Sequence, residues 1–429
     1  MPHQPGRPTP LVRAYALASR ALAPLAMRRV RRKLAAQGVT SERMGERMGR
    51  ATLPRPDGPL VWFHAASVGE SLSILRLIQH LGEAHPGLNF LITSGTATSA
   101  QIVAARMPSR CRHQFSPLDS PAAVARFLDH WRPDAGIFVE SELWPNMLRG
   151  AAARDIPLAL LNARISDRSA RGWARIASTA RYLLGHFKTV HCQDTRTADH
   201  LRTLGCEQAA MGANLKAMAG PLPHDAAALD ALNAQIGARP VWAMASTHPG
   251  EDEVALTAHR ALLAKHPKTL LILIPRHPER ADTIARMIAQ SGLSHTRRSV
   301  GEDIGPDQIY LADTLGEMGL WYRLAPIVCL GGSFVPVGGH NPYEPAHSGA
   351  AVLHGPLYAN FAQAYAQMDA AGAARQVPGA DALGTALLAL IEEPDDLDAM
   401  QANAARFAAA QDDRLADLAT DLCAALKLG

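Results

Sequence analysis

The sequence predicts an α/β protein with two doubly wound domains, each a parallel sheet covered by helices. First, short apolar runs typical of buried strands alternate with helical patterns from residue 60 to about 192, and again from residue 241. Second, residues 216–239 are rich in Gly, Pro, Asn and Ala and break this alternation. Third, 429 residues are enough for two domains that each bury a core.

Read in order, the chain divides into five expected segments. They are a basic segment over 1–50, an N-terminal domain over 51–215, a linker over 216–239, a C-terminal domain over 240–395 and a helical segment over 396–429. The last segment is Ala- and Asp-rich, and the N-terminal domain is a candidate surface for it to pack against.

The expected elements of the two domains follow from apolar periodicity. In the N-terminal domain we expect strands over 60–64, 90–94, 135–140, 156–162 and 188–192, and helices over 69–82, 97–106, 121–130 and 169–186. In the C-terminal domain we expect strands over 241–246, 269–275, 308–313, 327–332 and 351–355, each followed by a helical pattern. Because open α/β sheets bind ligands at the carboxyl ends of their strands, the loops there are the places to look for function.

Cysteine usage and known motifs exclude several classes of protein. The five cysteines are scattered and form no CxxC pair, which argues for a reducing compartment and against a zinc ribbon or a disulfide framework. Neither HExxH nor GxxxxGK[ST] occurs, and the second half lacks a GxGxxG loop before its first helix, which weakens a dehydrogenase interpretation. We therefore expect no metal and no cofactor.

Basic residues concentrate at the N-terminus, where the first 50 residues hold eleven Lys and Arg but only two Glu. A helical wheel separates arginines from an apolar face: Arg13, Arg20 and Arg31 stand opposite Leu11, Tyr15, Ala18 and Leu22. This layout is typical of a helix lying in an anionic membrane surface, although a solvated basic arm or an ordinary packing helix fits equally well. The arginines and Pro24 argue against a spanning helix. Only 5% of the chain is aromatic and its folded body is not basic, which argues against nucleic-acid binding.

The loop after the first expected strand, HAASVGE (residues 64–70), passes directly into a helix. Ser67 and Gly69 free backbone donors there, and Glu70 stands in the first helical turn. Glu70 is either a general base for an incoming hydroxyl, if burial raises its pKa, or a capping carboxylate stabilised by the helix dipole. In the loop after the next strand, Ser94 and Thr96 can hold a carboxylate, phosphate or sugar, or simply cap a helix.

Two further loops of the N-terminal domain carry charged side chains. VESELWPN (residues 139–146) places Glu140 and Glu142 beside Trp144, an arrangement that can bind sugar hydroxyls or an acceptor amine or hydroxyl. A solvated acidic loop is the alternative. In LNARISDRS (residues 161–169), Asn162 and Arg164 can pair with a ligand carboxylate or phosphate, whereas an Arg–Asp surface pair is the simpler interpretation.

In the C-terminal domain, STHPGEDE (residues 246–253) and PRHPER (residues 275–280) each follow a strand. The candidate ligand-binding residues here are Ser246, His248, Glu251, Arg276 and His277. Arg276 and His277 are natural phosphate ligands at such a position.

The stretch from Gly331 to Gly349 completes the candidate site of this domain. Its glycines allow sharp turns and close approach to a ligand, and we expect Asn341 and Pro342 to open a helix whose free N–H groups suit a phosphate. Glu344 can accept hydrogen bonds from ribose hydroxyls. A strand–turn–helix in which the glycines serve geometry alone is the alternative. The candidate binding residues are Gly332, Ser333, Gly338, Gly339, His340, Asn341 and Glu344.

Taken together, eight stretches resemble the 3-deoxy-D-manno-octulosonic acid (Kdo) transferase family, glycosyltransferase family 30. They are HAASVGE, TSGTATSA, VESELWPN, LNARISDRS, STHPGE, PRHPER, DTLGEMGLWY and GGSFVPVGGHNPYEPA, in this order between about residue 43 and about residue 370.

The resemblance implies a GT-B fold, with two Rossmann-like domains facing a central cleft. It also implies an inverting transfer of Kdo from CMP-Kdo to a lipid A precursor (lipid IVA) in lipopolysaccharide core synthesis, at the cytoplasmic face of the inner membrane. The N-terminal half would bind the acceptor and the C-terminal half CMP.

The resemblance also implies roles for individual residues. Glu70 matches the catalytic base, Glu140 and Glu142 the acidic acceptor-side motif, and Arg276 a ligand of the CMP phosphate. Asn341 and Glu344 match the nucleotide loop, and Lys216 the lysine of a Gly-Asn-Leu-Lys stretch.

The sequence departs from the family pattern in two places. The stretch around Lys216 reads GANLKAMAG and lacks the usual Phe-Asp after the lysine. The N-terminal segment is interrupted by arginines, so we expect peripheral anchoring. The alternatives are a sugar-nucleotide epimerase of the same architecture and a non-catalytic, membrane-bound nucleotide-sensing module.

Overall fold

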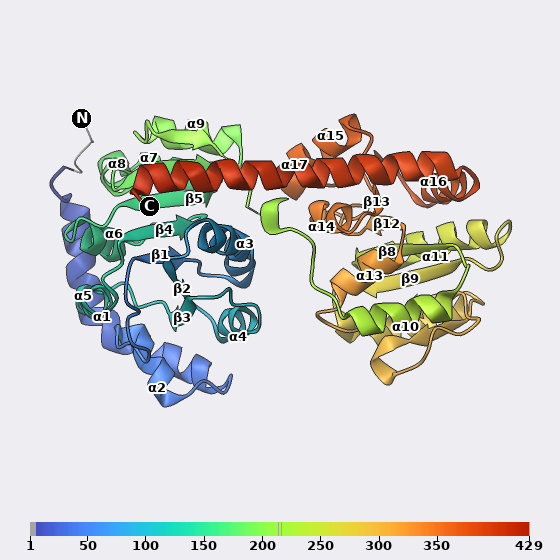
Figure 1. Ribbon diagram of the computed structural model, residues 1–429, viewed down its shortest axis with the longest axis horizontal. Coiled ribbons are helices and arrows are strands. Elements are labelled where there is room, and N and C mark those ends of the chain that lie inside the picture. Colours follow the sequence, from blue (N-terminus) through green and yellow to red (C-terminus); the bar gives the residue numbers. More distant parts are fainter. Residues whose placement is uncertain (1–5, 213, 216, 429) are drawn as a thin grey trace. The chain divides into compact units, whose positions relative to one another are not determined.

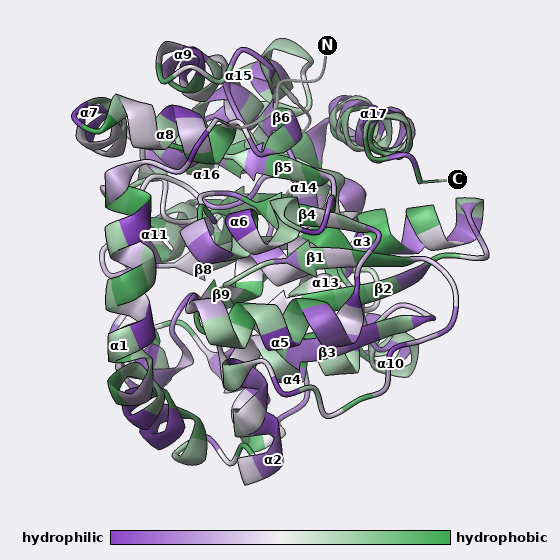
Figure 2. Cartoon of the chain, turned by 90° about the vertical axis from the view of Figure 1, so that its left-hand side faces the viewer, coloured by the Kyte–Doolittle hydropathy of each residue, from purple (hydrophilic) through white to green (hydrophobic). Residues whose placement is uncertain are grey.

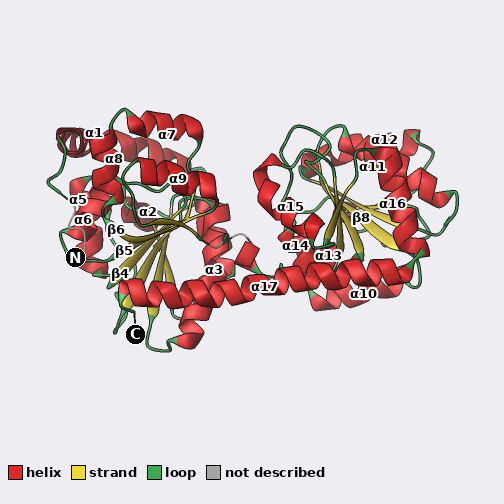
Figure 3. Ribbon diagram, turned by 90° about the horizontal axis from the view of Figure 1, so that it is seen from above, coloured by secondary structure: helices red, strands yellow, loops and turns green. Residues whose placement is uncertain are grey.

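The computed structural model describes residues 6–212, 214–215 and 217–428 of the chain. The chain divides into two compact units (Figure 1). The first unit comprises Met1–Ala219 and Asp413–Gly429, and the second comprises Gly220–Asp412. Each unit contains a seven-stranded sheet in which every pair of neighbouring strands is parallel, with helices on both faces (Figure 3).

The sheet of the first unit has the strand order β3-β2-β1-β4-β5-β6-β7. Its strands are β1 (Leu60–His64), β2 (Asn89–Ser94), β3 (Cys111–Phe115), β4 (Ala135–Val139), β5 (Leu158–Ala163), β6 (Phe187–Cys192) and β7 (Ala209–Met211). The helices between them are α3 (Val68–Ala84), α4 (Ala97–Ala105), α5 (Pro121–Trp131), α6 (Pro145–Ala152), α7 (Asp167–Ala174), α8 (Ala177–Leu184) and α9 (Thr195–Thr203). The strand order reverses direction between β1 and β4, which is the topological switch point where doubly wound sheets bind ligands.

The sheet of the second unit has the order β10-β11-β9-β8-β12-β13-β14 and reverses between β8 and β12. Its strands are β8 (Val241–Thr247), β9 (Leu270–Pro275), β10 (His295–Arg297), β11 (Ile309–Leu311), β12 (Ile327–Leu330), β13 (Ala351–His354) and β14 (Ala374–Gln376). Its helices are α10 (Ala226–Ile236), α11 (Glu251–Leu263), α12 (Ala281–Gln290), α13 (Met318–Leu324), α14 (Tyr343–His347), α15 (Ala362–Ala370) and α16 (Ala380–Glu392).

Alternating side chains of the central strands supply the cores on the two faces of each sheet. In β1, Leu60 and Trp62 pack into one apolar cluster, whereas Val61 and Phe63 pack into the cluster on the opposite face. Successive residues of a strand point to opposite faces, so a strand that is buried on both sides is apolar throughout. This explains why the uninterrupted run LVWFH predicted a central parallel strand, and the doubly wound α/β prediction is confirmed.

The expected strand positions agree with the structure at the centre of each sheet and are incomplete at the edges. The edge strands β3, β7, β10 and β14 and the helices α6 and α9 were not expected. In β3, the sequence CRHQF carries Arg112 and His113 and lacks the apolar run typical of a central strand. The helix expected over 169–186 is two helices, α7 and α8, separated at Arg175 and Ile176.

Part of the segment that the sequence suggested as a linker is helical. Residues 226–236 form α10, which begins at the N-cap Asp225, and Leu232 and Ile236 are buried in the core of the second unit. This helix is short and Ala-rich, with apolar residues spaced for one buried face.

The N-terminal segment contains one long helix, α1 (Pro10–Ala35), followed by the short helix α2 (Ser41–Met44). Thr9 is the N-cap of α1, and Pro24 is tolerated inside it. Val12, Ala23, Met27 and Leu34 are its buried residues. Tyr15, which the helical wheel placed on the membrane-facing side, is half-buried, and it donates a hydrogen bond to Asp119 of the unit. The face left exposed by α1 instead carries four leucines: Leu11, Leu17, Leu22 and Leu25.

Hydrophilic and hydrophobic residues alternate along α1 (Figure 2). Its arginines from Arg13 to Arg32 are exposed beside the leucines. Among the described helices, none combines the length and the apolar composition needed to cross a membrane.

The C-terminal helix α17 (Pro394–Leu426) belongs to both units by its contacts. Ala404 and Ala408 pack into a core cluster of the second unit, whereas Leu415, Leu418 and Leu422 pack into a cluster of the first unit.

Candidate functional site

The first candidate site lies at the switch point of the first unit. Strands β1 and β4 are neighbours in the sheet, so the loops that leave their carboxyl ends start side by side. The β1–α3 loop carries Ser67, Gly69 and Glu70, and the β4–α6 loop carries Glu140, Glu142 and Trp144.

Glu70 is fixed at the start of α3 by a reciprocal capping arrangement. Its Oε2 accepts a hydrogen bond from the Ala66 N–H at 2.8 Å, and its Oε1 accepts one from the Ser67 hydroxyl at 2.7 Å. The Ser67 hydroxyl oxygen in turn accepts the Glu70 N–H at 3.3 Å. Each carboxylate oxygen therefore retains a lone pair for a further donor, such as a substrate hydroxyl.

Two opposing influences set the pKa of Glu70. Burial raises it, the hydrogen bonds from Ser67 and Ala66 lower it, and the charges of Glu142 and Glu140 raise it again, with a net upward shift. A carboxylate with a raised pKa is a stronger base near neutral pH. The capping and general-base interpretations of Glu70 are thus compatible.

Glu142 is held in its ionised form by His64, a residue buried at the end of β1. The His64 Nε2 lies 3.1 Å from Oε2 of Glu142, and the Trp144 indole N–H donates to the same oxygen. Burial favours the neutral form of Glu142, but the hydrogen bonds from His64 and Trp144 outweigh it and lower its pKa. Nδ1 of His64 lies 3.0 Å from the Thr93 hydroxyl, which fixes the imidazole ring.

Backbone strain gathers at the ends of three strands that carry expected site residues. Glu140, Asn162 and Ser246 adopt φ values of 59°, 53° and 61°. These values lie in the left-handed region that L-residues rarely occupy, and such residues often cluster at active sites and ligand-binding loops. Asn162 is fully buried, and within the described residues its Nδ2 has no hydrogen-bond partner.

The remaining expected residues of the first unit differ in their availability to a ligand. Thr96 caps α4 and is half-buried, whereas Trp144 is 40% exposed. Arg164 is exposed, and Asp167 forms ion pairs with Arg196 and His200 and none with Arg164.

Ser94 does not fit the expected role. It is fully buried, and its hydroxyl is hydrogen-bonded to His113 at 2.9 Å, so it positions the β2–α4 loop and is not exposed to a ligand. Lys216 lies outside the described residues.

In the second unit, Glu251 links the two loops at the switch point between β8 and β12. Its Oε2 accepts the His248 and Gly332 N–H groups at 2.9 and 2.7 Å, and its Oε1 accepts the Ser333 and Phe334 N–H groups at 3.1 and 2.9 Å. The residue is fully buried. We therefore assign Glu251 a positioning role, in contrast to the direct substrate contact that the sequence suggested.

Ser333 is likewise buried, and its hydroxyl both donates and accepts a hydrogen bond within the protein. Its hydroxyl donates to the Leu330 carbonyl at 2.6 Å and accepts the Gly355 N–H at 2.8 Å. It shapes the loop and does not face a ligand.

Three histidines from three loops cluster at this edge of the second sheet. His248 and His340 are stacked with ring centroids 5.3 Å apart, and the rings of His248 and His277 are 5.7 Å apart. Burial, followed by the charges of His248 and Arg276, lowers the pKa of His340 to about 4. Burial is also the largest cause of the lowered pKa of His248. Both rings are therefore neutral hydrogen-bonding groups at neutral pH.

The glycine-rich stretch bends closely around these histidines. Gly332 has a φ of 65°, and a Cβ there would lie 2.9 Å from Nε2 of His340. Gly339 has a φ of 79°, and a Cβ there would lie 3.1 Å from Cα of Tyr358. The expected need for glycine at these positions is thus both conformational and steric.

Asn341 and Glu344 lie at the start of the short helix α14. The Asn341 Nδ2 donates to Glu344 Oε1 at 3.2 Å, and its Oδ1 accepts the Tyr343 N–H at 3.2 Å. We expected Asn341 as the N-cap and Pro342 in the first turn. Helix α14 instead begins at Tyr343, one residue later, and Pro342 is its N-cap. Burial raises the pKa of Glu344, while the Asn341 hydrogen bond and the charge of Arg276 oppose this shift.

Arg276 is exposed beside the histidines and supplies positive charge at this edge. Its neighbour Arg280 instead forms an ion pair with the buried Asp252. The Arg280 guanidinium also donates to the Thr247 carbonyl, at 3.1 Å. The arrangement gives the site one cation available to an anionic ligand and one that supports the β8 and β9 loops.

The sequence interpretation missed His64 and Arg280 as members of the two sites. Both stand inside the quoted stretches HAASVGE and PRHPER, so position alone could have drawn attention to them. Their partners Glu142 and Asp252 follow only from the tertiary structure. Among the described residues, no group of His, Cys, Asp and Glu side chains is arranged to hold a metal ion.

Comparison with known proteins shows one family for this chain. Residues 42–219 match a family model described as 3-deoxy-D-manno-octulosonic-acid transferase (kdotransferase). A 3-deoxy-D-manno-octulosonic acid transferase of Bordetella pertussis is 37% identical over 421 residues, which cover 92% of this chain and 95% of that protein.

Two solved structures share the fold at low sequence identity. A glycosyltransferase from Rickettsia africae is 12% identical, with a TM-score of 0.59, over 87% of this chain and 100% of its own. A protein from Listeria monocytogenes described as a UDP-N-acetylglucosamine 2-epimerase is 12% identical, with a TM-score of 0.57, over 82% of this chain and 94% of its own. The expected GT-B fold class is confirmed, and the fold alone does not separate the two activities.

Proposed function

The chain belongs to the 3-deoxy-D-manno-octulosonic acid transferase family, and we propose that it moves Kdo from CMP-Kdo to a lipid A precursor with inversion at the anomeric carbon. It is a glycosyltransferase by family. Membership favours transfer over the epimerase alternative, because the relative that covers nearly the whole chain is a transferase.

One observation supports the chemistry most directly: two carboxylates at one switch point have pKa values displaced in opposite directions. The pKa of Glu70 is raised by burial and by neighbouring carboxylates, whereas hydrogen bonds from His64 and Trp144 lower that of Glu142 against its burial. Displaced pairs of this kind identify the base and its electrostatic partner. Glu70 is the base, and Glu142 holds a fixed negative charge beside it.

The proposed reaction proceeds by direct displacement. The hydroxyl of the acceptor sugar donates to a carboxylate oxygen of Glu70 and loses its proton as its oxygen attacks the anomeric carbon of Kdo. The bond from that carbon to the CMP phosphate oxygen breaks, and CMP leaves with the electron pair. Trp144 and Glu140, in the β4–α6 loop, would bind the acceptor sugar.

The second unit is proposed to hold the donor. Arg276 would pair with the phosphate of CMP. His248 and His340 beside it are neutral and add no charge, and their Nε2 atoms are hydrogen-bonded to each other at 3.1 Å. Glu344, fixed by Asn341, would accept hydrogen bonds from the ribose hydroxyls. Donors that are already in place when charge develops on the leaving phosphate stabilise the transition state most.

We further propose that the protein acts at the cytoplasmic face of the inner membrane through α1. The exposed leucines of α1 would enter the interface, and its arginines would contact anionic head groups. Together they would bring the acceptor site to a lipid substrate.

The test is a transfer assay with Glu70→Gln. Purified protein is incubated with freshly made CMP-Kdo and tetraacylated lipid A precursor, and the products are read by mass spectrometry. We expect the variant to lose about 10²–10⁴-fold in kcat, the usual contribution of a general base, while CMP affinity is unchanged.

Three outcomes would contradict the proposal. Wild-type-like turnover by Glu70→Gln would remove Glu70 from the role of base. If the wild-type protein binds CMP and leaves both substrates intact, the nucleotide-sensing alternative is favoured. Conversion of a soluble sugar nucleotide without acceptor would favour the epimerase.

A further inference from the structure

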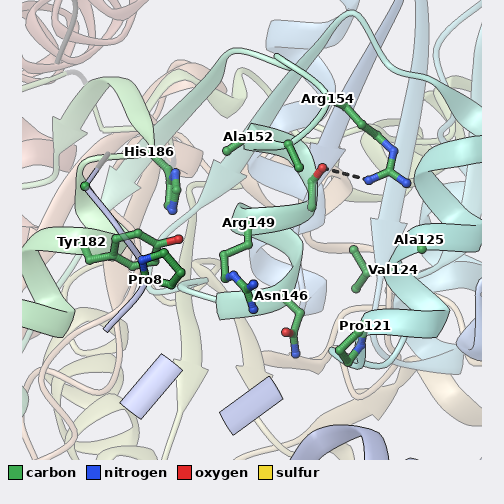
Figure 4. A pocket seen from close by; sticks show the side chains of 13 residues that line it. Pro8, Pro121, Val124, Ala125, Asn146, Arg149, Ala152, Arg154, Tyr182 and His186 are labelled. Carbon is green, nitrogen blue, oxygen red and sulfur yellow. Dashed lines mark hydrogen bonds between the residues drawn. The ribbon is translucent and has the colours of Figure 1, made fainter. Parts of the chain in front are cut away.

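A pocket of about 480 Å³ lies in the first unit, and it shares no residue with the candidate site. Gly6 and Pro8, which precede α1, line it together with residues in or directly after the helices α5, α6 and α8. Figure 4 shows these side chains. Its apolar lining residues are Pro8, Pro121, Val124, Ala125, Ala152 and Ala153. Its polar side chains are those of Asn146, Arg149, Arg154, Tyr182 and His186, and Gly6 and Gly150 complete the lining.

His186 is the most unusual group in this pocket. Its exposed fraction is 8%, and within the described residues neither ring nitrogen has a hydrogen-bond partner. A buried polar atom without a partner costs stability, so an imidazole with two such atoms is unusual unless a ligand or water satisfies it. The ring of Tyr182 packs edge-on against it, with centroids 4.8 Å apart, which fixes the orientation of the imidazole.

Arg149 brings an uncompensated positive charge to the same pocket. Its side chain lies between the Tyr182–His186 pair and Asn146 (Figure 4). The nearby Arg154 is neutralised by an ion pair with Asp129, at 2.6 Å, whereas Arg149 has no acidic partner among the described residues. Among the described residues that line the pocket, none is Asp or Glu. Burial, with a smaller contribution from the charge of Arg149, lowers the pKa of His186 to about 4, so the ring is neutral.

We propose that this pocket binds the phosphate group of a small organic phosphate ester, with the Arg149 guanidinium and a His186 N–H as its donors. The guanidinium binds two phosphate oxygens in a bidentate manner, and the imidazole N–H reaches a third. The phenol of Tyr182 is a further donor on the same side. The pocket is several times larger than one phosphate, so its apolar lining residues leave room for the organic part of the ester.

The ester has two possible sources with the same chemistry. It is a soluble phosphate ester or the head group of an anionic phospholipid. The second source is consistent with the place of Gly6 and Pro8 in the lining, since these residues lead directly into α1, the helix whose exposed leucines we propose to enter the membrane interface.

The experiment titrates the full-length protein with glycerol 3-phosphate by isothermal titration calorimetry. We expect saturable binding to the wild type and a loss of about tenfold or more in affinity in Arg149→Met, which removes a charge-assisted bidentate contact. His186→Phe should also weaken binding. It should fold normally, because the change removes two unpartnered nitrogens from a buried position. Arg175→Met is the matched control, since it removes the same charge from an exposed position outside the pocket and should bind like the wild type.

A second arm distinguishes the sources. The same four proteins are sedimented with phosphatidylcholine vesicles that contain or lack phosphatidic acid. A lower vesicle affinity of Arg149→Met than of Arg175→Met, specific to phosphatidic acid, would identify the lipid source. Binding of glycerol 3-phosphate without that difference would identify a soluble ester.

The proposal is overturned if neither probe distinguishes Arg149→Met from Arg175→Met, or if acetate or glycerol binds as well as glycerol 3-phosphate. Kdo transfer is measured separately on the same variants. Absence of Kdo transfer by the wild type would contradict the proposed function. It would not affect the phosphate-site proposal, which the binding experiments test.

Discussion

The carboxylate of Glu251 holds together the two loops that form the candidate donor site, and Glu251→Gln tests that role. The amide has nearly the same shape, but one of its terminal atoms is an –NH₂ donor. Each oxygen of Glu251 accepts two backbone N–H groups. Either orientation of the glutamine amide therefore leaves two buried N–H groups facing another donor.

The expected loss follows from these two unsatisfied groups. A buried polar group without a partner costs about 1–3 kcal/mol, so the free energy of unfolding of the second unit should fall by about 2–6 kcal/mol. In a unit of roughly 200 residues, each kcal/mol lowers Tm by about 2–4 °C. We therefore expect a decrease in Tm on the order of 10 °C.

Differential scanning calorimetry of the full chain measures the change, with and without CMP. Glu253→Gln is the matched control, since it makes the same chemical change two residues away on the exposed side of α11. CMP should bind more weakly to Glu251→Gln because the Gly332–Phe334 backbone loses its anchor. Equal Tm values for the two variants would refute the reasoning, and they would mean that the four contacts contribute little to stability.

Three other perturbations test the remaining parts of the structure. Glu142→Gln removes a negative charge that raises the pKa of Glu70, so the pKa of Glu70 should fall. The acidic limb of the pH–rate profile, where Glu70 ionises, should then move to lower pH. An unchanged limb would show that the charge of Glu142 does not affect Glu70. Gly339→Ala should lower the free energy of unfolding by about 1–3 kcal/mol and weaken CMP binding, because Gly339 has a φ of 79°. Gly384→Ala is the control, since Gly384 lies in a helix and a Cβ there would make ordinary contacts. Equal stability of the two variants would contradict this prediction. The double variant Leu17→Glu/Leu22→Glu should bind anionic vesicles about tenfold or more weakly, because it loses apolar surface that the membrane would bury. Leu53→Glu, which changes an exposed leucine outside α1, should bind like the wild type. Unchanged binding of the double variant would exclude this face of α1 as the membrane contact.

The sequence by itself determined the fold class and most of the central strands. Strands buried on both faces must be apolar throughout, so runs such as LVWFH and TLLILIP can be recognised as strands from the sequence alone. Edge strands are not bound by that condition. The polar β3 sequence, with Arg112 and His113, consequently gave no strand signal.

The sequence also located the functional loops, because chemistry at a doubly wound sheet follows the carboxyl ends of its strands. It placed Glu70, Glu142 and Arg276 at such ends. It also suggested that burial could raise the pKa of Glu70, and the structure agrees with that direction.

Only the tertiary structure decided which of these residues face a ligand and which hold the loops in place. Glu251 and Ser333 have side chains typical of binding residues, yet both are buried. Their hydrogen bonds go to backbone groups in segments up to 83 residues away. The pair of His64 and Glu142 is separated by 78 residues. Local sequence encodes the kind of side chain and its place along a strand, whereas hydrogen bonding, burial and the resulting pKa depend on neighbours that the fold brings from elsewhere in the chain.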